Sequence, residues 1–445
     1  MIVVKFGGGV LDGAEGLRRV RDEILALPRP LVVVTSAFRD VTNRLEAIVA
    51  EAPASEHRAL AMLEELAATH RAIAAEVLGD EGIGAWTDAV GDLLERLGEI
   101  VRGLAIVHEL SARTLDLAVS FGERLASATL LAAVRAGGAD ATAIPATELI
   151  ITDNHHRFAR PNLELTAERV RERLVPALTD DAIVVTEGYI ARSVSGETTT
   201  MGRESSAYSA TLLGELAGAR EVRIYTAVPG ILTADPALIE SARTLPHLSY
   251  GAARALAELG AKILHPRTVT PVEQAGIPLV IRSLDGDGTT IDGTEEPDGC
   301  SVVLLPESTL ISVRAAAVST SEEEFVRELS QRVPLVWRGR FRHRLQFVTS
   351  ARIALESLPL HLFDGPIDCD VVDGAVVSLV RQRGTDARDL AAFFEMLGER
   401  TPLAVLGGIE RHAVGVFVPL DDDARALVER LHDRFVDAGL PVRSQ

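Results

Sequence analysis

The sequence contains only two lysines, Lys5 and Lys262, among its 45 basic residues, and arginine supplies the rest. Arginine therefore serves wherever the surface needs only a solvated positive charge. The two exceptions indicate positions where a wide planar guanidinium does not fit, whereas a compact ammonium can lie close to a phosphoryl oxygen. Both lysines are candidate phosphate-binding residues, and the alternative that they persist by chance stays open.

Other scarcities exclude whole classes of protein. Cys300 and Cys369 are too few for a disulfide framework or a cysteine metal cluster, so we expect a reducing cytoplasm. No apolar run reaches about 18 residues, and the first residues read as a core strand rather than a signal peptide, so no membrane span is predicted. A net charge of -19 and a pI near 5.1 lack the basic footprint of a nucleic-acid binder. Small-molecule chemistry is favoured.

The first 290 residues carry the alternation of a parallel sheet. The β-branched runs Ile2–Phe6 and Leu31–Thr35 flank an amphipathic segment at Gly13–Leu27, which is a β-α-β pattern. Residues 56–136 predict several helices that flank the sheet, with a break around Gly79–Gly84. Further strands are predicted at Thr142–Ile144, Ala182–Thr186, Val222–Tyr225 and Pro278–Arg282. We expect a doubly wound, mainly parallel α/β domain over residues 1–290.

A second region follows the turn-rich segment Asp285–Asp298, where we place the domain boundary. Strand and helix patterns recur beyond it, and two small α+β modules over residues 305–445 fit that length better than one. The predicted strands are Leu310–Ala315, Leu345–Val348, Ala375–Val380 and Val414–Val418, and the predicted helices are Glu322–Leu329, Asp386–Leu397 and Asp422–Phe435. This region is expected to be regulatory or to mediate dimerisation.

Two stretches look suited to anions. In Lys5-Phe6-Gly7-Gly8-Gly9, a triple glycine after a strand lets backbone N–H groups approach an anion, while the lysine neutralises charge. A simple tight turn is the alternative. The polar stretch Glu197–Ser206, before a helix predicted from Ser209, combines hydroxyls, an arginine and a helix start, which suits a carboxylate or phosphate. A capped, solvated loop is the alternative.

Two further stretches are ambiguous by themselves. Ser120-Phe121-Gly122-Glu123-Arg124 is predicted to open a helix at Leu125, where a carboxylate ordinarily only complements the helix dipole. The stretch Tyr225–Gly230, together with Lys262, would line a nucleotide pocket at the carboxyl edge of the sheet.

Taken in order, these stretches resemble an aspartokinase of the amino-acid-kinase superfamily. The resemblance runs from Lys5 to about Arg282 and is strongest in S-F-G-E-R-L, in G-E-T-T-T-M-G-R and in the segment Ser249–Thr268. Residues 305–445 resemble the paired ACT-type modules of that family, most visibly at Arg411–Pro419. Several linked motifs in one order are far more specific than a single glycine loop.

The resemblance implies ATP-dependent phosphorylation of the β-carboxylate of L-aspartate, with Mg²⁺ bridging the donor phosphates, and a homodimer formed through the C-terminal modules. It assigns Lys5 to the transferring phosphoryl group, with Glu123 facing the substrate ammonium and Arg203 its α-carboxylate. The remaining residues that it assigns to the amino acid are Ser36, Thr42 and Ser206, and those that it assigns to the nucleotide are Gly7, Gly8, Gly9, Thr226, Gly230 and Lys262.

Several positions depart from the family pattern. The family reads K-F-G-G-T-S where this chain has Gly9 and Val10, and G-R-G-G-S-D where it has Gly202–Ala207, so a catalytic Asp is missing. We hypothesise that Glu204 replaces it. In the nucleotide stretch two Asp residues become Ala227 and Pro229. The sequence therefore favours an active but altered kinase, acting on aspartate or an analogue. A non-catalytic subunit that binds an amino acid, or an enzyme of a specialised pathway, stays open.

Overall fold

The computed structural model describes residues 1–202, 204–259, 264–294, 299–314, 321–341, 344–363, 367–407, 411–419 and 423–437. Lys262 and Arg203 lie outside these ranges. The chain divides into two compact units, one made of Met1–Gly230 with Arg267–Thr290 and the other of Ile231–Pro266 with Ile291–Gln445. The domain limits 1–290 and 305–445 stay a prediction.

The first unit is built on a mainly parallel sheet whose order is β3-β5-β2-β1-β8-β10-β11. The five pairs among the first six strands are all parallel. These strands are β3 (Ala141–Ala143), β5 (Ile183–Glu187), β2 (Leu31–Thr35), β1 (Ile2–Phe6), β8 (Val222–Tyr225), β10 (Leu279–Arg282) and β11 (Thr289–Asp292). A small sheet joins β4 (Ile151–Thr152), β6 (Ile190–Ser193) and β7 (Thr198–Thr200). The predicted α/β class is confirmed.

Helices cover both faces of this sheet. Ile2, Val4 and Phe6 of β1 belong to a core shared with α1 and α4, whereas Val3 faces Gly214 of α7. Since alternate residues of a strand point to opposite faces, α7 lies on the face opposite to α1 and α4. The helices are α1 (Gly13–Ala26), α2 (Val41–Glu51), α3 (Glu56–Val107), α4 (Ala112–Ala136), α5 (Ala146–Leu149), α6 (Leu163–Arg169), α7 (Ser205–Ala217) and α9 (Pro266–Ala275).

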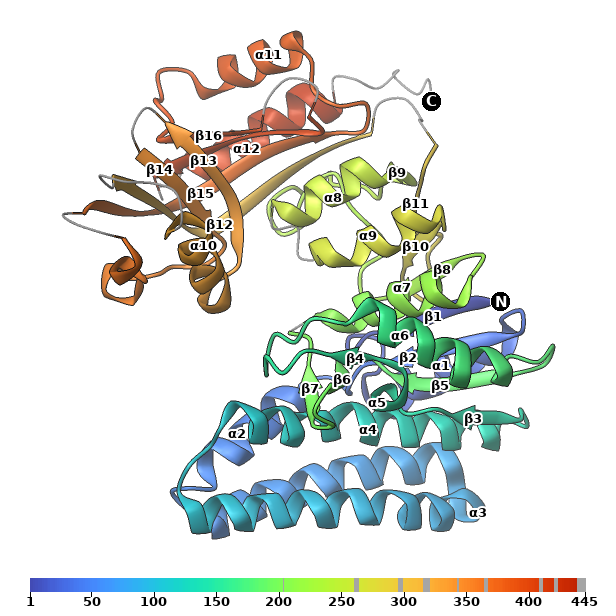
Figure 1. Ribbon diagram of the computed structural model, residues 1–445. Helices are drawn as coiled ribbons and strands as arrows, with labels where there is room; N and C mark the ends of the chain where they lie inside the picture. The colour runs from blue at the N-terminus through green and yellow to red at the C-terminus, as the bar shows by residue number, and fades with distance from the viewer. Residues whose placement is uncertain are drawn as a thin grey trace. The chain divides into compact units, whose positions relative to one another are not determined.

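The predicted glycine break in the helical segment is confirmed. Gly79 has φ 64° and ψ -172°, so α3 consists of two helical arms. The arms double back on each other, because a side chain at Gly98 would contact Leu63. Trp86 donates a hydrogen bond from Nε1 to Thr129 Oγ1 of α4 at 3.0 Å. Figure 1 shows α2, α3 and α4 gathered on one side of the sheet, as the sequence predicts for a flanking layer.

Two predicted helix starts are wrong. Ser120–Arg124 does not open a helix but lies in the middle of α4, which begins at Ala112 after an N-cap at Ser111. The helix predicted from Ser209 is α7, which begins at Ser205. Of the helices in the described ranges, α4 is long and apolar enough to cross a membrane, yet 72% of its most apolar window is buried within the protein. This burial is typical of a core helix.

The second unit carries a six-stranded sheet in the order β13-β14-β12-β15-β17-β16, in which every pair is antiparallel. Its strands are β12 (Cys300–Arg314), β13 (Leu335–Phe341), β14 (Arg344–Thr349), β15 (Asp368–Arg381), β16 (Ala404–Gly407) and β17 (Ala413–Pro419). Its other elements are β9 (His247–Ser249), α8 (Tyr250–Glu258), α10 (Ser321–Arg332), α11 (Ala387–Leu397) and α12 (Asp423–His432). α10 packs in one apolar cluster, and α11 and α12 pack in another. Two α+β modules therefore share one sheet.

Candidate functional site

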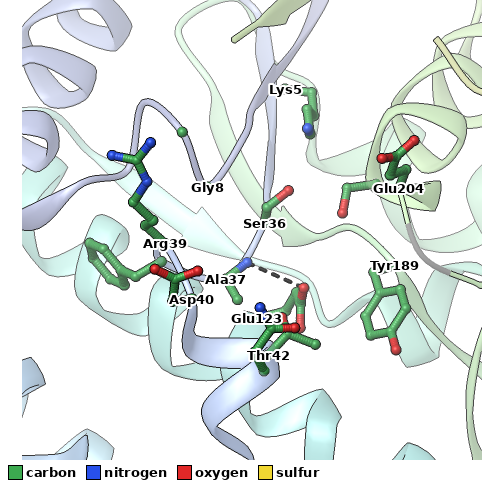
Figure 2. A pocket seen from close by; sticks show the side chains of 14 residues that line it. Lys5, Gly8, Ser36, Ala37, Arg39, Asp40, Thr42, Glu123, Tyr189 and Glu204 are labelled. Carbon is green, nitrogen blue, oxygen red and sulfur yellow. Dashed lines mark hydrogen bonds between the residues drawn. The ribbon is translucent and has the colours of Figure 1, made fainter. Parts of the chain in front are cut away.

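A cavity of about 390 Å³ opens where β1, β2 and β5 end. These three strands are neighbours and parallel, so their carboxyl ends meet at one edge of the sheet, the place where open α/β folds bind ligands. The residues that line the cavity are Lys5, Gly8, Gly9, Ser36, Ala37, Phe38, Arg39, Asp40, Thr42, Asn43, Glu123, Tyr189, Glu204 and Ser206. Figure 2 shows Lys5 and Glu123 reaching the pocket from opposite sides, with Ser36 between them.

Lys5 lies within β1, and its ammonium lies against the glycine turn. A Cβ added to Gly7 would lie 3.0 Å from Lys5 Nζ, so the ammonium lies close to the backbone of the glycine turn. Desolvation by burial lowers the pKa of Lys5 to about 8, while the charges of Glu204 and Glu123 act in the opposite direction. The ammonium is therefore poorly solvated and would gain from an anionic partner.

The glycine turn leaves backbone donors available at the pocket. The N–H of Gly7 donates to the Tyr225 carbonyl at 3.1 Å and continues the pairing of β1 with β8. In the described part of the chain, the N–H groups of Gly8 and Gly9 donate to no acceptor. Gly8 also approaches the backbone closely, since a Cβ there would lie 3.0 Å from the Ala37 carbonyl oxygen. Two free N–H groups beside a lysine are suited to a phosphate.

Glu123 supplies the opposite charge from α4. It is 3% exposed; its Oε1 accepts the N–H of Ala37 at 3.2 Å, while no described group bonds its Oε2. Burial raises the pKa of Glu123 to about 8, and the N–H of Ala37 opposes this shift. Gly122 makes the approach possible, because a Cβ there would lie 3.0 Å from Ala37 Cβ. A buried carboxylate oxygen without a partner is costly unless a ligand donates to it.

The serine-rich turn at the start of α7 closes another side of the pocket. Ser206 is buried in the first turn of α7, and Glu204 is the N-cap residue. Glu204, Tyr189 and Asp40 all have positive φ, at 66°, 68° and 62°. These are three of the five non-glycine residues with positive φ in the described ranges, and such strained backbone often marks functional sites.

A buried carboxylate outside the pocket holds the neighbouring segments in place. Asp116 of α4 accepts hydrogen bonds from Thr200 Oγ1 at 2.6 Å, from the N–H of Thr200 at 3.1 Å and from the N–H of Arg157 at 2.9 Å. It is fully buried. The sequence analysis missed Asp116, because only the tertiary fold brings α4 to β7. These bonds tie β7, the strand that precedes position 203 in the sequence, to α4.

The predicted site residues divide into three groups. Those that line the cavity are Lys5, Gly8, Gly9, Ser36, Thr42, Glu123, Glu204 and Ser206, while Gly7, Thr226 and Gly230 do not line it, and Arg203 and Lys262 lie outside the described residues. The sequence analysis missed the lining residues Arg39, Asp40 and Asn43. Their position directly after β2 was the available signal, because loops at the carboxyl ends of parallel strands form binding sites.

Gly188 is a sensitive point in this site. A Cβ there would lie 2.6 Å from Ser206 Cβ and 2.8 Å from its Cα, so Gly188→Ala must push the start of α7 away from β5. We expect a loss of about 1–3 kcal/mol in the free energy of unfolding, measured by urea denaturation. Gly103→Ala is the control, since a Cβ there meets nothing within 4 Å and should stabilise α3 by about 1 kcal/mol. Equal stability of both variants would contradict the close packing of Gly188.

The sequence of this chain is similar to sequences of known proteins. Residues 1–283 match the family described as Amino acid kinase family. The aspartokinase of Chlamydia pneumoniae is 33% identical over 323 residues, which cover 72% of this chain and 67% of that protein. Aspartokinase 1 of Arabidopsis thaliana, a chloroplastic protein, is 31% identical over 329 residues, which cover 70% of this chain and 56% of that protein.

The fold is also similar to that of solved aspartokinases. The crystal structure of E. coli aspartokinase III in complex with aspartate and ADP superposes with a TM-score of 0.83 and covers 97% of this chain and 99% of that one. The Clostridium acetobutylicum aspartate kinase gives a TM-score of 0.73, covering 98% and 100%. Sequence identity is 24% and 19%, so these likenesses establish the architecture, including the paired C-terminal modules.

Proposed function

Since the chain belongs to the amino acid kinase family and, within it, to the aspartokinases, we propose that it transfers the γ-phosphoryl group of ATP to the β-carboxylate of L-aspartate or a close analogue. One observation supports this most directly: a single cavity joins a lysine beside a glycine turn to a buried, unbonded carboxylate oxygen. The first feature suits a phosphoryl donor, and the second suits the ammonium of an amino acid.

The chemistry that we propose needs positioning more than proton transfer. A carboxylate oxygen of the acceptor attacks the γ-phosphorus, the bond from that phosphorus to the bridging oxygen breaks, and ADP leaves with the negative charge. Lys5 and the N–H groups of Gly8 and Gly9 would stabilise charge on the transferring group. Glu123 would bind the ammonium of the amino acid and so hold the acceptor in line.

The hydroxyl-bearing residues Ser36, Thr42 and Ser206 would orient the acceptor carboxylates. They line the same cavity as Lys5 and Glu123. Arg203, which lies outside the described residues, is assigned to the α-carboxylate by the family pattern alone. The roles of Thr226, Gly230 and Lys262 toward the nucleotide are likewise proposals.

Mg²⁺ would reach this site with the nucleotide. The described residues contain no group of three His, Cys, Asp or Glu side chains that could hold a metal ion. Mg²⁺ in phosphoryl-transfer sites needs only one or two carboxylates besides phosphate oxygens, and Asp40 and Glu204 provide carboxylates at the pocket. These residues fit a Mg-nucleotide, in which the ion neutralises charge on the donor phosphates.

Glu204 is the residue that we propose in place of the missing catalytic Asp. It lines the pocket on the turn before α7, and its charge raises the pKa of Lys5. A carboxylate there keeps the ammonium protonated and can contact the donor metal ion. The position that carries Asp in the family pattern is Ala207, one turn further along the same helix.

Trapping the acyl phosphate with hydroxylamine tests the proposal. We expect the purified chain to form a hydroxamate only when Mg-ATP and aspartate, or an analogue found by scanning amino acids, are both present. Glu204→Gln should lower turnover by at least about 10²-fold, because it removes a charge at the transferring group. Unchanged turnover in this variant would remove Glu204 from the mechanism.

A second candidate is a subunit that binds an amino acid without phosphorylating it. The observation that favours it lies beside the glycine turn, where a Cβ on Gly9 would lie 3.1 Å from Ala227 Cβ. The family pattern has Asp at position 227, so the contact with the phosphate-binding turn is altered here. Calorimetry with Mg-ATP distinguishes the two, since binding of an amino acid without any nucleotide binding or hydroxamate would favour the second candidate.

The remaining proposals concern assembly and location. A homodimer formed through residues 305–445 follows from the family resemblance, and a cytoplasmic location follows from the scarcity of cysteine; both stay proposals. The basic residues Arg338 and Arg340 are exposed on β13, an edge strand of the second unit.

A further inference from the structure

A second cavity of about 390 Å³ lies entirely within the second unit and is separate from the kinase pocket. Three parts of the chain form it: one face of α8, the edge strand β13, and the end of β16 with the residues at the start of β17. The residues that line it are Gly251, Arg254, Ala255, Glu258, Leu259, Val336, Trp337, Leu406, Gly407, Arg411, His412 and Ala413. β13 and β16 are the two opposite edges of the six-stranded sheet, so the sheet curls until both edges meet around one cavity.

Glycines give this cavity its shape. A Cβ on Gly339 would lie 2.2 Å from the Trp337 ring, so the indole packs over Gly339 of its own strand. A Cβ on Gly251 would lie 2.2 Å from His412 Nε2, so the imidazole packs directly on the first turn of α8. Neither aromatic group could take its position beside a larger residue.

The polar side of the cavity is held by hydrogen bonds. The carbonyl of Arg411 accepts bonds from the N–H and the Oγ1 of Thr385, at 2.7 and 2.9 Å. The next residue, His412, accepts the N–H of Arg381 at its carbonyl at 2.8 Å. α8 is also anchored, since Gln382 Oε1 accepts the N–H of its N-cap residue Ser249 at 2.8 Å. The backbones that carry Arg411 and α8 are thus fixed relative to each other.

The lining combines an apolar wall with a positive rim. Trp337 and Leu406 provide apolar surface from the two edge strands, and Leu259 adds more from α8. Arg254 and Arg411 provide two guanidinium groups against the single carboxylate of Glu258. Two arginines beside an aromatic wall suit a small molecule with one carboxylate and an apolar body, because arginine binds carboxylates through paired N–H donors.

We propose that this cavity binds a small carboxylate with an apolar body, which would contact α8 and both edges of the sheet at once. The ligand could be an apolar α-amino acid or an acid without an amino group, since both share the carboxylate and the apolar body. Its binding depends on the second unit alone and not on the proposed kinase activity.

The two tryptophans of the chain make the test direct. Trp86 is 3% exposed in the first unit, while Trp337 lines the cavity, so Trp86→Phe leaves Trp337 as the sole indole reporter. The full chain with this substitution is titrated with L-leucine, L-phenylalanine, 4-methylpentanoate and 3-phenylpropanoate, and binding is confirmed by calorimetry. Butylamine, which lacks a carboxylate, is the ligand control.

We expect a saturable change in Trp337 fluorescence with carboxylates and none with butylamine. Arg411→Gln should weaken binding at least about tenfold, because it removes a charged donor. Ala255→Phe, which fills the cavity from α8, should abolish binding, and it serves as an independent variant should Arg411→Gln impair folding. Arg338→Gln is the matched control, since this exposed arginine on β13 does not line the cavity, and its affinity should be unchanged.

Two results would overturn the proposal. One is the absence of saturable binding of all four carboxylates up to about 10 mM, by both fluorescence and calorimetry. The other is binding that Arg411→Gln and Ala255→Phe leave unaltered while circular dichroism shows both variants folded, because the carboxylate would then lie elsewhere. A preference for the amino acids over the acids without an amino group would further assign the ammonium to Glu258.

Discussion

Lys5→Met is expected to lower kcat of the proposed kinase reaction by at least about 10³-fold while leaving the chain folded. The ammonium lines the same cavity as Gly8 and Gly9, where we propose that charge develops on the transferring phosphoryl group, and loss of one such cation typically costs this much. Stability should not fall, because burial already disfavours the Lys5 charge and lowers its pKa to about 8. Single-turnover kinetics and thermal unfolding measure the two effects separately.

Lys5→Arg is the informative control. The planar guanidinium of arginine is wider than the compact ammonium of lysine and cannot place its charge at the same point, so arginine should restore the charge but not the rate. Activity of Lys5→Met within tenfold of the unaltered chain would show that Lys5 does not stabilise the transferring group. A large loss of stability in this variant would instead show that Lys5 has a structural role.

The second large expected effect is a dependence on pH: the affinity for the amino acid should increase as the pH rises. Glu123 has a pKa of about 8 in the unliganded protein, so it is mostly protonated at pH 7. An ammonium prefers the carboxylate, and binding must therefore release close to one proton at pH 7. We expect the dissociation constant to fall about tenfold per pH unit from pH 6 to pH 8 and to level off above. Calorimetry in buffers of different ionisation enthalpy measures the proton release.

Two variants test this assignment. Glu123→Gln should weaken binding strongly and leave it independent of pH between 6 and 8. Glu187→Gln is the matched control, since Glu187 is also buried with a raised pKa, yet its Oε2 accepts the N–H of Ala146 at 2.7 Å outside the pocket. It should keep the pH dependence, shifted to lower pH because the charge of Glu187 helps to raise the pKa of Glu123. Persistent pH dependence in Glu123→Gln would refute the assignment.

The pKa shifts of Glu123 and Lys5 also make the stability of the unliganded chain depend on pH. The pKa of Glu123 is raised from 4.5 to about 8, so its contribution is fully present below pH 4.5 and is lost as the pH rises through 8. The pKa of Lys5 is lowered from 10.5 to about 8, so between these values the unfolded chain binds the additional proton and stability increases with pH. Both charges are therefore unfavourable near neutral pH until ligands arrive.

Much of the sheet could be predicted from the sequence. Ile2–Phe6, Leu31–Thr35 and Val222–Tyr225 have the bounds that the structure gives to β1, β2 and β8, because short β-branched runs between polar turns leave little ambiguity. Lys5 and Glu123 line one cavity, but the family pattern and not their spacing links them in the sequence, and their roles stay predictions.

The errors came from reading local signals without their tertiary partners. Gly122 suggests a helix boundary, yet it lies inside α4, where glycine lets the helix pack closely against Ala37. The polar residues Ser205 and Ser206 looked like a loop, but they form the first turn of α7, where serines are tolerated. Packing decided both cases, and no local pattern encodes it.

The meeting of two sheet edges around α8 has a consequence for evolution of the second unit. An exposed strand edge can recruit other chains and aggregate, but here Trp337 and Leu406 turn part of each edge toward a shared interior space. A substitution that flattened the sheet would open this space and expose both strands together. Selection against aggregation through exposed strand edges should therefore preserve the curl even in descendants that bind nothing there.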